Sequence, residues 1–252
     1  MKYLEKKNEH ERDPHLSFDE KSHQYFVHGD KFISSTTLIH SYFSKFDADE
    51  IIDNMQKSPN WSNNKYYPLH KDEIKSIWSK NSESAIIQGT KLHQDIESYL
   101  NFEVFSNESK EFQYFLNFFR ENRINTYRTE WPIYDEESKI AGTIDCCCEN
   151  NYGELILYDW KRSKEIKRRS DFKKKFALSD ELSHLEDVNF NHYSLQLNLY
   201  KYILEKNYNK KVKEMYLAVF HPDNFNKNYI IVTIPDMKKE IEFIVKKRIN
   251  AN

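Results

Sequence analysis

The chain of 252 residues is 38% hydrophobic, 15% aromatic and 31% charged, and its net charge is −2. That length fits one large domain with a substantial core, and the interspersed charges of both signs argue against a disordered chain. The nearly neutral balance excludes a protein coated with positive charge for nucleic acid, and the lack of a long apolar run argues against a membrane span.

The N-terminal third predicts a hairpin and then helices. Alternating apolar residues over 23–35, with a His-Gly-Asp turn, indicate the hairpin. Amphipathic patterns then predict helices over residues 36–55, 71–79, 84–100 and 108–122. No linker, repeat or low-complexity tract divides the chain. We therefore expect a single domain, with residues 1–82 as an N-terminal hairpin and helical extension and 83–252 as the core.

The rest of the chain alternates between strand and helix patterns. Strand patterns separated by short turns, which favour an antiparallel meander, cover residues 129–134, 140–148 and 155–160. They are followed by a helix over 191–205, strands over 215–220 and 229–234, and a last helix from Pro235 to near Ile249. This order predicts an α/β fold with a central mixed sheet flanked by helices.

The three cysteines are consecutive, Cys146, Cys147 and Cys148. Adjacent cysteines cannot surround a tetrahedral metal, and there is no Cys-x-x-Cys pair, so we expect neither a zinc site nor an iron–sulfur cluster. Buried thiols on a core strand in a reducing compartment are the simpler interpretation. The N-terminal residues show no secretion signal, and their acids argue against a mitochondrial presequence. We expect an intracellular protein.

Two acids and a lysine stand at the ends of neighbouring strand patterns. Asp145 closes Gly142-Thr-Ile-Asp, and Asp159 closes the next pattern, two residues before Lys161. Side chains alternate along a strand, so Asp159 and Lys161 share a face and Trp160 points the other way. Two carboxylates with an ammonium can hold a hard divalent cation and a polarised water, although strand-end acids are also common in sites without function.

Lys161 can stabilise negative charge on a phosphate or orient an attacking water. A lysine has a pKa of about 10.4, so it would act as a base only after strong perturbation, and metal-bound water loses its proton more readily. We therefore expect an electrostatic and positioning role. Glu130, which opens the first central strand pattern, could add a third carboxylate or be a surface acid.

His93 lies in a helix pattern with Gly89 four residues before it and Glu97 four after it, all on one face. A histidine and an acid on one face can reach the same cation, although a single helical histidine is more often structural. Gln196 and Tyr200 share a face of a later helix and could contact a phosphate or a base, although that helix is mainly a core element.

A basic run follows the lysine. Residues 161–175 hold nine Lys or Arg against two acids, a net charge of +7. Such a run is usually a solvated loop, but its position favours contact with a polyanion. The candidate nucleic-acid contacts within it are Arg162, Lys164, Lys167, Arg168 and Arg169.

Together these motifs resemble the PD-(D/E)XK nuclease superfamily, in its RecB-like branch, and most of all the mitochondrial genome maintenance exonucleases and related phage and viral exonucleases. The resemblance covers roughly residues 35–202. The motifs that carry it are Gly89 with His93, Gly142 with Asp145, Asp159 with Lys161, and Gln196 with Tyr200.

The resemblance implies a restriction-endonuclease-like core and a role for each residue. His93, Asp145, Asp159 and the backbone carbonyl of Trp160 would bind one or two Mg²⁺ or Mn²⁺ ions. Lys161 would act on the nucleophilic water, with Glu130 in a supporting role among the catalytic acids. The nucleic acid would be contacted by Gly89, Gln196, Tyr200 and the basic run. The iron–sulfur cysteines of some relatives are absent.

The expected function is that of a metal-dependent DNA exonuclease that prefers single strands and serves replication, recombination or repair. DNA would be its main partner, with a helicase or replication and recombination proteins as further partners and no membrane. It would work in the cytoplasm, the nucleus or a viral replication site. An endonuclease of the same fold, acting on DNA or RNA, and a catalytically inactive nucleic-acid-binding module remain as alternatives.

Overall fold

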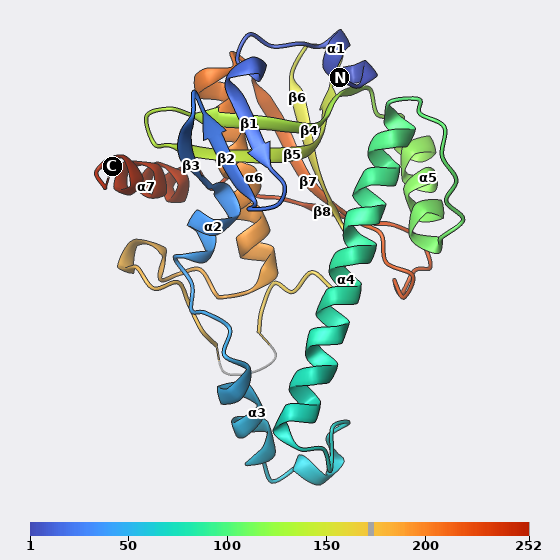
Figure 1. The fold of residues 1–252 in the computed structure, drawn as a ribbon, viewed down its shortest axis with the longest axis vertical. Helices are drawn as coiled ribbons and strands as arrows, with labels where there is room; N and C mark the ends of the chain where they lie inside the picture. The colour runs from blue at the N-terminus through green and yellow to red at the C-terminus, as the bar shows by residue number, and fades with distance from the viewer. Residues whose placement is uncertain (171–173, 252) are drawn as a thin grey trace. The chain divides into compact units, whose positions relative to one another are not determined.

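The computed structural model describes residues 1–170 and 174–251, and it has the expected α/β architecture, with a central mixed sheet and helices on its faces (Figure 1). By its contacts the chain forms two compact units, one made of Met1–Ser44 with Leu92–Asn252 and the other of Lys45–Lys91. Among the described residues, no helix is long and apolar enough to cross a membrane.

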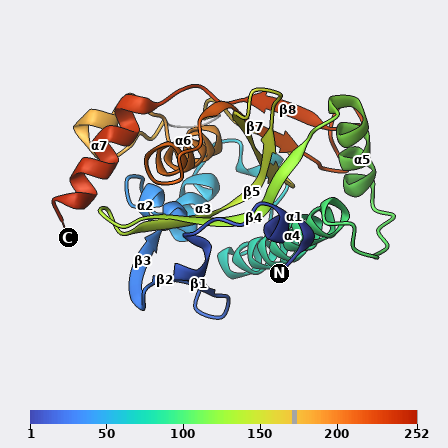
Figure 2. The ribbon, with the colours of Figure 1, turned by 90° about the horizontal axis from the view of Figure 1, so that it is seen from above.

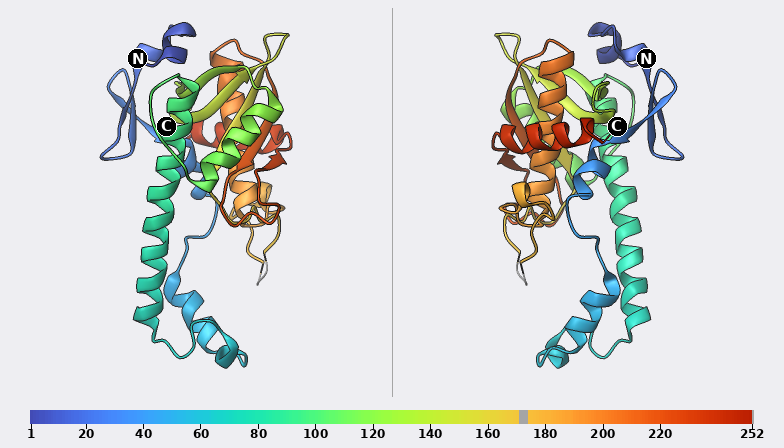
Figure 3. Two further views of the ribbon diagram at one scale, coloured as in Figure 1. Left: turned by 90° about the vertical axis from the view of Figure 1, so that its right-hand side faces the viewer. Right: turned by 90° about the vertical axis from the view of Figure 1, so that its left-hand side faces the viewer.

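All the strands belong to the larger unit. They are β1 Leu16–Asp19, β2 Gln24–Val27, β3 Asp30–Ser34, β4 Thr126–Asp135, β5 Ile140–Glu149, β6 Leu155–Lys161, β7 Val212–Val219 and β8 Ile230–Thr233. The strand order is β1-β2-β3-β5-β6-β7-β8, and β4 pairs with the other edge of β5. Figure 3 shows the three N-terminal strands (blue) at one side of this unit.

The helices are α1 Tyr3–Lys7, α2 Ser35–His40, α3 Ala48–Gln56, α4 Lys71–Leu100, α5 Lys110–Asn122, α6 Asn189–Asn207 and α7 Lys238–Ile249. Within the larger unit they cover the two faces of the sheet. Apolar side chains of α2, α6 and α7 form one core with the sheet, and those of α1, α5 and the C-terminal part of α4 form the other. Seen from above, α6 and α7 lie on one side of β4 and β5, with the end of α4 on the other (Figure 2).

The predicted meander is confirmed. Strands β4 and β5 pair antiparallel along nearly their whole length, and β5 pairs with β6 from Cys146↔Tyr158 to Glu149↔Leu155. Strand β3 pairs with the same edge of β5 but only at Ile140 and Ala141. Among the described strands, none pairs with residues 142–145 on that edge. The stretch Gly142–Asp145 therefore lies in a gap between β3 and β6.

Three helix predictions were wrong in their boundaries. The pattern over 36–55 forms two helices, because the side chain of Asp47 caps a new helix by accepting from Glu50 N at 3.0 Å. The patterns over 71–79 and 84–100 form one helix, α4. Ser84, where the second of these patterns begins, lies inside α4, and its hydroxyl accepts from the Gln88 side chain.

The smaller unit holds α3, the first part of α4 and the loop between them. Its packing centres on Ile52 and Ile74, both fully buried. Trp78 contacts the rings of Phe46 and Tyr66, each with ring centroids 6.0 Å apart. An ion pair joins Lys71 to Asp53. Few buried residues thus hold this unit together.

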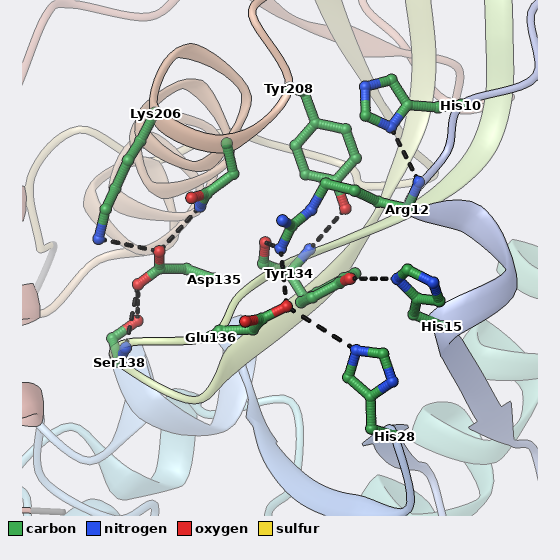
Figure 4. Close-up of polar contacts among 11 residues, drawn as sticks. His10, Arg12, His15, His28, Tyr134, Asp135, Glu136, Ser138, Lys206 and Tyr208 are labelled. Carbon is green, nitrogen blue, oxygen red and sulfur yellow. Dashed lines mark hydrogen bonds and ion pairs between the residues drawn. The ribbon is translucent and has the colours of Figure 1, made fainter.

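The N-terminal segment is fastened to the sheet by polar contacts (Figure 4). The guanidinium of Arg12 lies over the ring of Tyr134, 4.0 Å from its centroid, and 3.6 Å from Glu136. Next to it, the Tyr134 amide donates to the hydroxyl of Tyr208 at 3.1 Å. These contacts join β4 both to the N-terminal segment and to the end of α6.

Asp13 accepts three further hydrogen bonds in the N-terminal segment. Its carboxylate accepts from Arg128 Nη1 at 2.7 Å, from Trp131 Nε1 at 3.0 Å and from the His10 amide at 2.9 Å. Arg128 is only 2% exposed. Arg128 Nη1 also donates to the Asn8 carbonyl at 2.9 Å, but a buried guanidinium needs a carboxylate partner to offset the cost of removing its charge from water.

Candidate functional site

The two predicted acids meet where β5 and β6 separate. The ladder between these strands ends at Cys146↔Tyr158, so Asp145 and Asp159 are the first residues beyond it. Asp145 reaches across the gap, and its Oδ2 accepts from the Trp160 amide at 2.8 Å. Burial raises the pKa of Asp145, and the neighbouring charge of Glu130 raises it further. A carboxylate in that condition favours a cation beside it.

His93 brings α4 to the same place. Its Nε2 donates to the carbonyl oxygen of Trp160 at 3.0 Å, which leaves Nδ1 facing two acids. Nδ1 lies 3.6 Å from Glu130 Oε1 and 3.6 Å from Asp145 Oδ2. Burial lowers the pKa of His93, but the carboxylates of Asp145 and Glu130 outweigh burial and raise it to about 9.

Glu130 completes the group from β4. It lies between Thr129, which pairs with Cys146, and Trp131, which pairs with Ile144, and so stands opposite Asp145. Its φ is 42°, a left-handed conformation that is rare for a residue other than glycine and unusual inside a strand. Backbone strain of this kind costs on the order of 1–3 kcal/mol and is concentrated at functional sites.

These three residues fit a divalent cation. The candidate ligand atoms of His93, Glu130 and Asp145 all lie within 4.8 Å of one another. Glu130 Oε1 is buried and makes no hydrogen bond among the described residues; its charged neighbour is His93 Nδ1 at 3.6 Å, so it can still accept a cation. One imidazole and two carboxylates suit Mg²⁺ or Mn²⁺, and three protein ligands leave positions for water and substrate.

Asp159 and Lys161 form a pair beside this group. Lys161 Nζ lies 2.6 Å from Asp159 Oδ2 and forms an ion pair with it. Burial raises the pKa of Asp159 to about 6, although Lys161 opposes this. Burial also lowers the pKa of Lys161, but Asp159 and Asp145 outweigh it, and the net shift is upward. Lys161 is therefore an ammonium at neutral pH.

The predicted metal ligands fall into two groups, the candidate cation group and the Asp159–Lys161 pair. His93 and Asp145 belong to the candidate cation group, and Glu130 joins them where the sequence favoured Asp159. Asp159 pairs with Lys161, and the carbonyl of Trp160 accepts from His93. Gly89 lies one helical turn before His93, and a Cβ added there would meet no described atom within 4 Å.

Gln196 and Tyr200 lie on α6, which packs on the face of the sheet opposite to the end of α4 that carries His93. Gln196 Nε2 donates to the Tyr200 hydroxyl at 2.8 Å, and Ser35 Oγ donates to the same hydroxyl at 3.0 Å. Tyr200 is only 2% exposed, so its ring packs in the core rather than offering a face to a base. A Cβ on Gly142 would come within 2.5 Å of the Tyr200 ring. Only glycine therefore fits at position 142.

Two residues in the described part of the basic run contact the first residues of α6. The Lys167 amide donates to Asn189 Oδ1 at 2.8 Å, and the Arg168 guanidinium lies 3.9 Å from the centroid of Phe190. Arg162 is mostly buried, with its Nε bonded to Glu111 at 2.7 Å. The remaining basic candidates, Lys164, Arg168 and Arg169, are exposed, and residues 171–173 of the run lie outside the described residues.

Several residues near the site were not predicted from the sequence. Ser35 is the hydrogen-bond partner of Tyr200 across 165 positions of the chain, and Tyr193 lies against Lys161 with the ammonium 4.5 Å from its ring centroid. Tyr193 precedes Gln196 by three residues, so the helical spacing that selected Gln196 and Tyr200 would also have included it. No sequence feature marked Ser35.

The pKa of His93 predicts how stability depends on pH without metal. A histidine whose pKa rises from 6.5 to about 9 on folding stabilises the native state below pH 6.5, and that contribution is lost as the pH rises through 9. The shift corresponds to about 3 kcal/mol. We expect the free energy of unfolding, measured with urea in EDTA, to fall between pH 6.5 and 9.5.

The matched variant is His93→Gln, in which this pH dependence should be nearly absent. Adding Mn²⁺ should restore stability to the wild-type protein, and more so at the higher pH, because a proton no longer competes for Nδ1. Equal pH slopes for the two proteins would show that His93 does not titrate as the structure implies.

Comparisons with known proteins give little beyond these observations. No known family profile matches the chain. Of the solved structures, 22 chains match. One of them, described as "Crystal structure of SSO0001", is 17% identical over 87% of this chain and 76% of its own, with a TM-score of 0.38. Function is therefore inferred from this chain's own residues.

Proposed function

We propose that the protein is a metal-dependent nuclease of the PD-(D/E)XK superfamily, in its RecB-like branch, and that it acts as a DNA exonuclease. The observation that carries the proposal is the convergence of His93, Glu130 and Asp145 next to the Asp159–Lys161 pair. A binding module has no need of a buried carboxylate oxygen without a hydrogen bond, Glu130 Oε1, beside the largely desolvated ammonium of Lys161, because both are costly.

Each side chain has a task in hydrolysis of a phosphodiester. Nδ1 of His93 and the carboxylates of Glu130 and Asp145 would hold one Mg²⁺ or Mn²⁺ ion, and Asp159 or the Trp160 carbonyl would complete that site or serve a second ion. The metal would supply an acidified water and neutralise charge on the scissile phosphate. The Lys161 ammonium, held by Asp159, would stabilise the negative charge that builds up on the phosphate oxygens.

Hydrogen bonds keep these groups in place. His93 donates to Trp160 through Nε2, which fixes the tautomer and turns Nδ1 toward the acids. Asp145 accepts from the Trp160 amide, so the backbone of one residue of β6 orients both His93 and Asp145. Because Lys161 keeps its proton at neutral pH, it serves as a fixed positive charge and not as a base.

The substrate we propose is single-stranded DNA. The exposed cations Lys164, Arg168 and Arg169 follow Lys161 directly and would contact phosphates in a salt-sensitive, sequence-independent way. Tyr200 would act by holding Gln196 rather than by stacking on a base, and the partly exposed Gln196 would contact the strand. Replication, recombination or repair is the setting we propose, with a helicase or related proteins as partners, inside the cell, where the three free thiols fit reducing conditions.

The test is cleavage of matched linear and circular single-stranded DNA in Mg²⁺, with Asp145→Asn as the control against a contaminating nuclease. Degradation of the linear form alone, lost in Asp145→Asn and in EDTA, is the expected result. Cutting of both forms would replace exonuclease by endonuclease, and preference for a matched RNA would replace the substrate. Metal-independent binding without any cleavage in Mg²⁺ or Mn²⁺ would favour an inactive binding module and contradict the proposal.

A further inference from the structure

Lys161 has a second partner besides Asp159. Its Nζ lies 4.5 Å from the ring centroid of Tyr193, which projects from the first turns of α6. Tyr193 is partly buried and packs against the core between α6 and the sheet. Lys161 itself is only 18% exposed at its side chain, so this contact is made in a largely desolvated place. A cation over an aromatic face is stabilised more strongly there than at an exposed surface.

The two partners hold the ammonium in complementary ways. Asp159 attracts it at 2.6 Å along the strand, while the ring of Tyr193 covers it from the helix side. An ammonium on a flexible four-carbon chain has three rotatable donors and no preferred direction of its own. Bound on two sides, it keeps only a limited set of directions for its remaining N–H groups.

We propose that Tyr193 is a positioning residue for Lys161, whose ring face and the Asp159 carboxylate together aim the ammonium at the scissile phosphate. This rests on the proposed nuclease function. The ring, and not the hydroxyl, performs the task, because the contact is made by the aromatic face. A loss of the ring therefore lowers the stabilisation of the transition state while leaving binding of the strand unchanged.

Two variants test this role. Tyr193→Leu keeps an apolar side chain that can pack against the core but removes the ring, and Tyr193→Phe keeps the ring but removes the hydroxyl. For linear single-stranded DNA in Mg²⁺ we expect Tyr193→Leu to lower kcat by about tenfold with little change in KM, and Tyr193→Phe to stay within about threefold of wild type. Tyr152→Leu, at a tyrosine that is 88% exposed between β5 and β6, is the control for loss of a tyrosine elsewhere.

A second measurement needs no cleavage. In the metal-free protein the ε-methylene protons of Lys161, assigned with Lys161→Met, should show an upfield shift in NMR spectra caused by the Tyr193 ring. The shift should persist in Tyr193→Phe and vanish in Tyr193→Leu. The same spectra report whether each variant is folded.

The outcomes separate this inference from the proposed function. If the wild type cleaves DNA but Tyr193→Leu has the wild-type kcat, the positioning role is wrong and the nuclease proposal stands. If both Tyr193 variants lose kcat equally, the hydroxyl matters and the ring-face account is overturned. If the wild type shows no Lys161-dependent cleavage, the nuclease proposal fails and the positioning role fails with it, even where the NMR shift confirms the contact.

Discussion

Replacing Lys161 with alanine is expected to lower kcat for cleavage of linear single-stranded DNA by about 10²–10³-fold, the usual effect of removing one preorganised donor to transition-state charge. The physical reason is that the Lys161 ammonium, held 2.6 Å from Asp159, keeps its positive charge at neutral pH and can stabilise charge on the phosphate. Initial rates at saturating DNA in Mg²⁺ measure the effect. Calorimetric binding of Mn²⁺ should be retained, because Lys161 is not among His93, Glu130 and Asp145.

The Lys161→Ala substitution also affects Asp159. Without Lys161 the buried carboxylate of Asp159 loses its partner, so its pKa should rise further above about 6 and it should be protonated near neutrality. The double variant Lys161→Met with Asp159→Asn removes both charges and should be equally inactive but more stable than Lys161→Ala. Lys213→Ala, at an exposed lysine on β7, is the matched control. Wild-type turnover by Lys161→Ala would refute the assignment.

Replacing Asp13 with alanine is expected to lower the free energy of unfolding by about 3–5 kcal/mol, the range for breaking one side of a buried ion pair. The change leaves the guanidinium of Arg128, which is 2% exposed, without its carboxylate, and it also removes the acceptor of Trp131 Nε1. Urea denaturation of the wild type and the variant in the same buffer measures the difference.

Two comparisons show whether burial is the cause. Asp223→Ala breaks an ion pair with Lys164 whose side chains are 65% and 76% exposed, and it should change stability by less than about 1 kcal/mol. Asp13→Leu combined with Arg128→Met removes both buried charges and should recover much of the loss. A cost for Asp13→Ala as small as that for Asp223→Ala would mean that the N-terminal segment contributes little to the fold.

The sequence predicted the sheet and most of the helices well, because their patterns are local. Three successive strand patterns, over 129–134, 140–148 and 155–160, with short turns between them were enough for the β4–β6 meander. The phenylalanines of α5 showed their buried face by helical spacing, and Phe115 and Phe118 are fully buried. The boundaries of α2, α3 and α4 were missed, since serine and aspartate caps can be recognised only where their backbone partners are known.

His93, Glu130 and Asp145 lie close together and Asp159 pairs with Lys161, but which residue contacts which could not be read from the sequence. Strand alternation placed Asp159 and Lys161 on one face, which also makes them ion-pair partners. Glu130 was only an acid at the start of a strand pattern, and its φ of 42° beside His93 depends on the tertiary structure. Ser35 and Tyr193 reach the site from distant segments, so no motif spacing includes both.

The fit of Gly142 against Tyr200 has an evolutionary consequence. Gly142 belongs to the Gly-x-x-Asp pattern and Tyr200 to the Gln-x-x-x-Tyr pattern, and a Cβ at position 142 would come within 2.5 Å of the Tyr200 ring and 2.6 Å of Ser35 Oγ. Selection at these positions is therefore not independent. A homologue that carries alanine in place of Gly142 should carry a smaller side chain in place of Tyr200, and the two motifs should be lost or kept together.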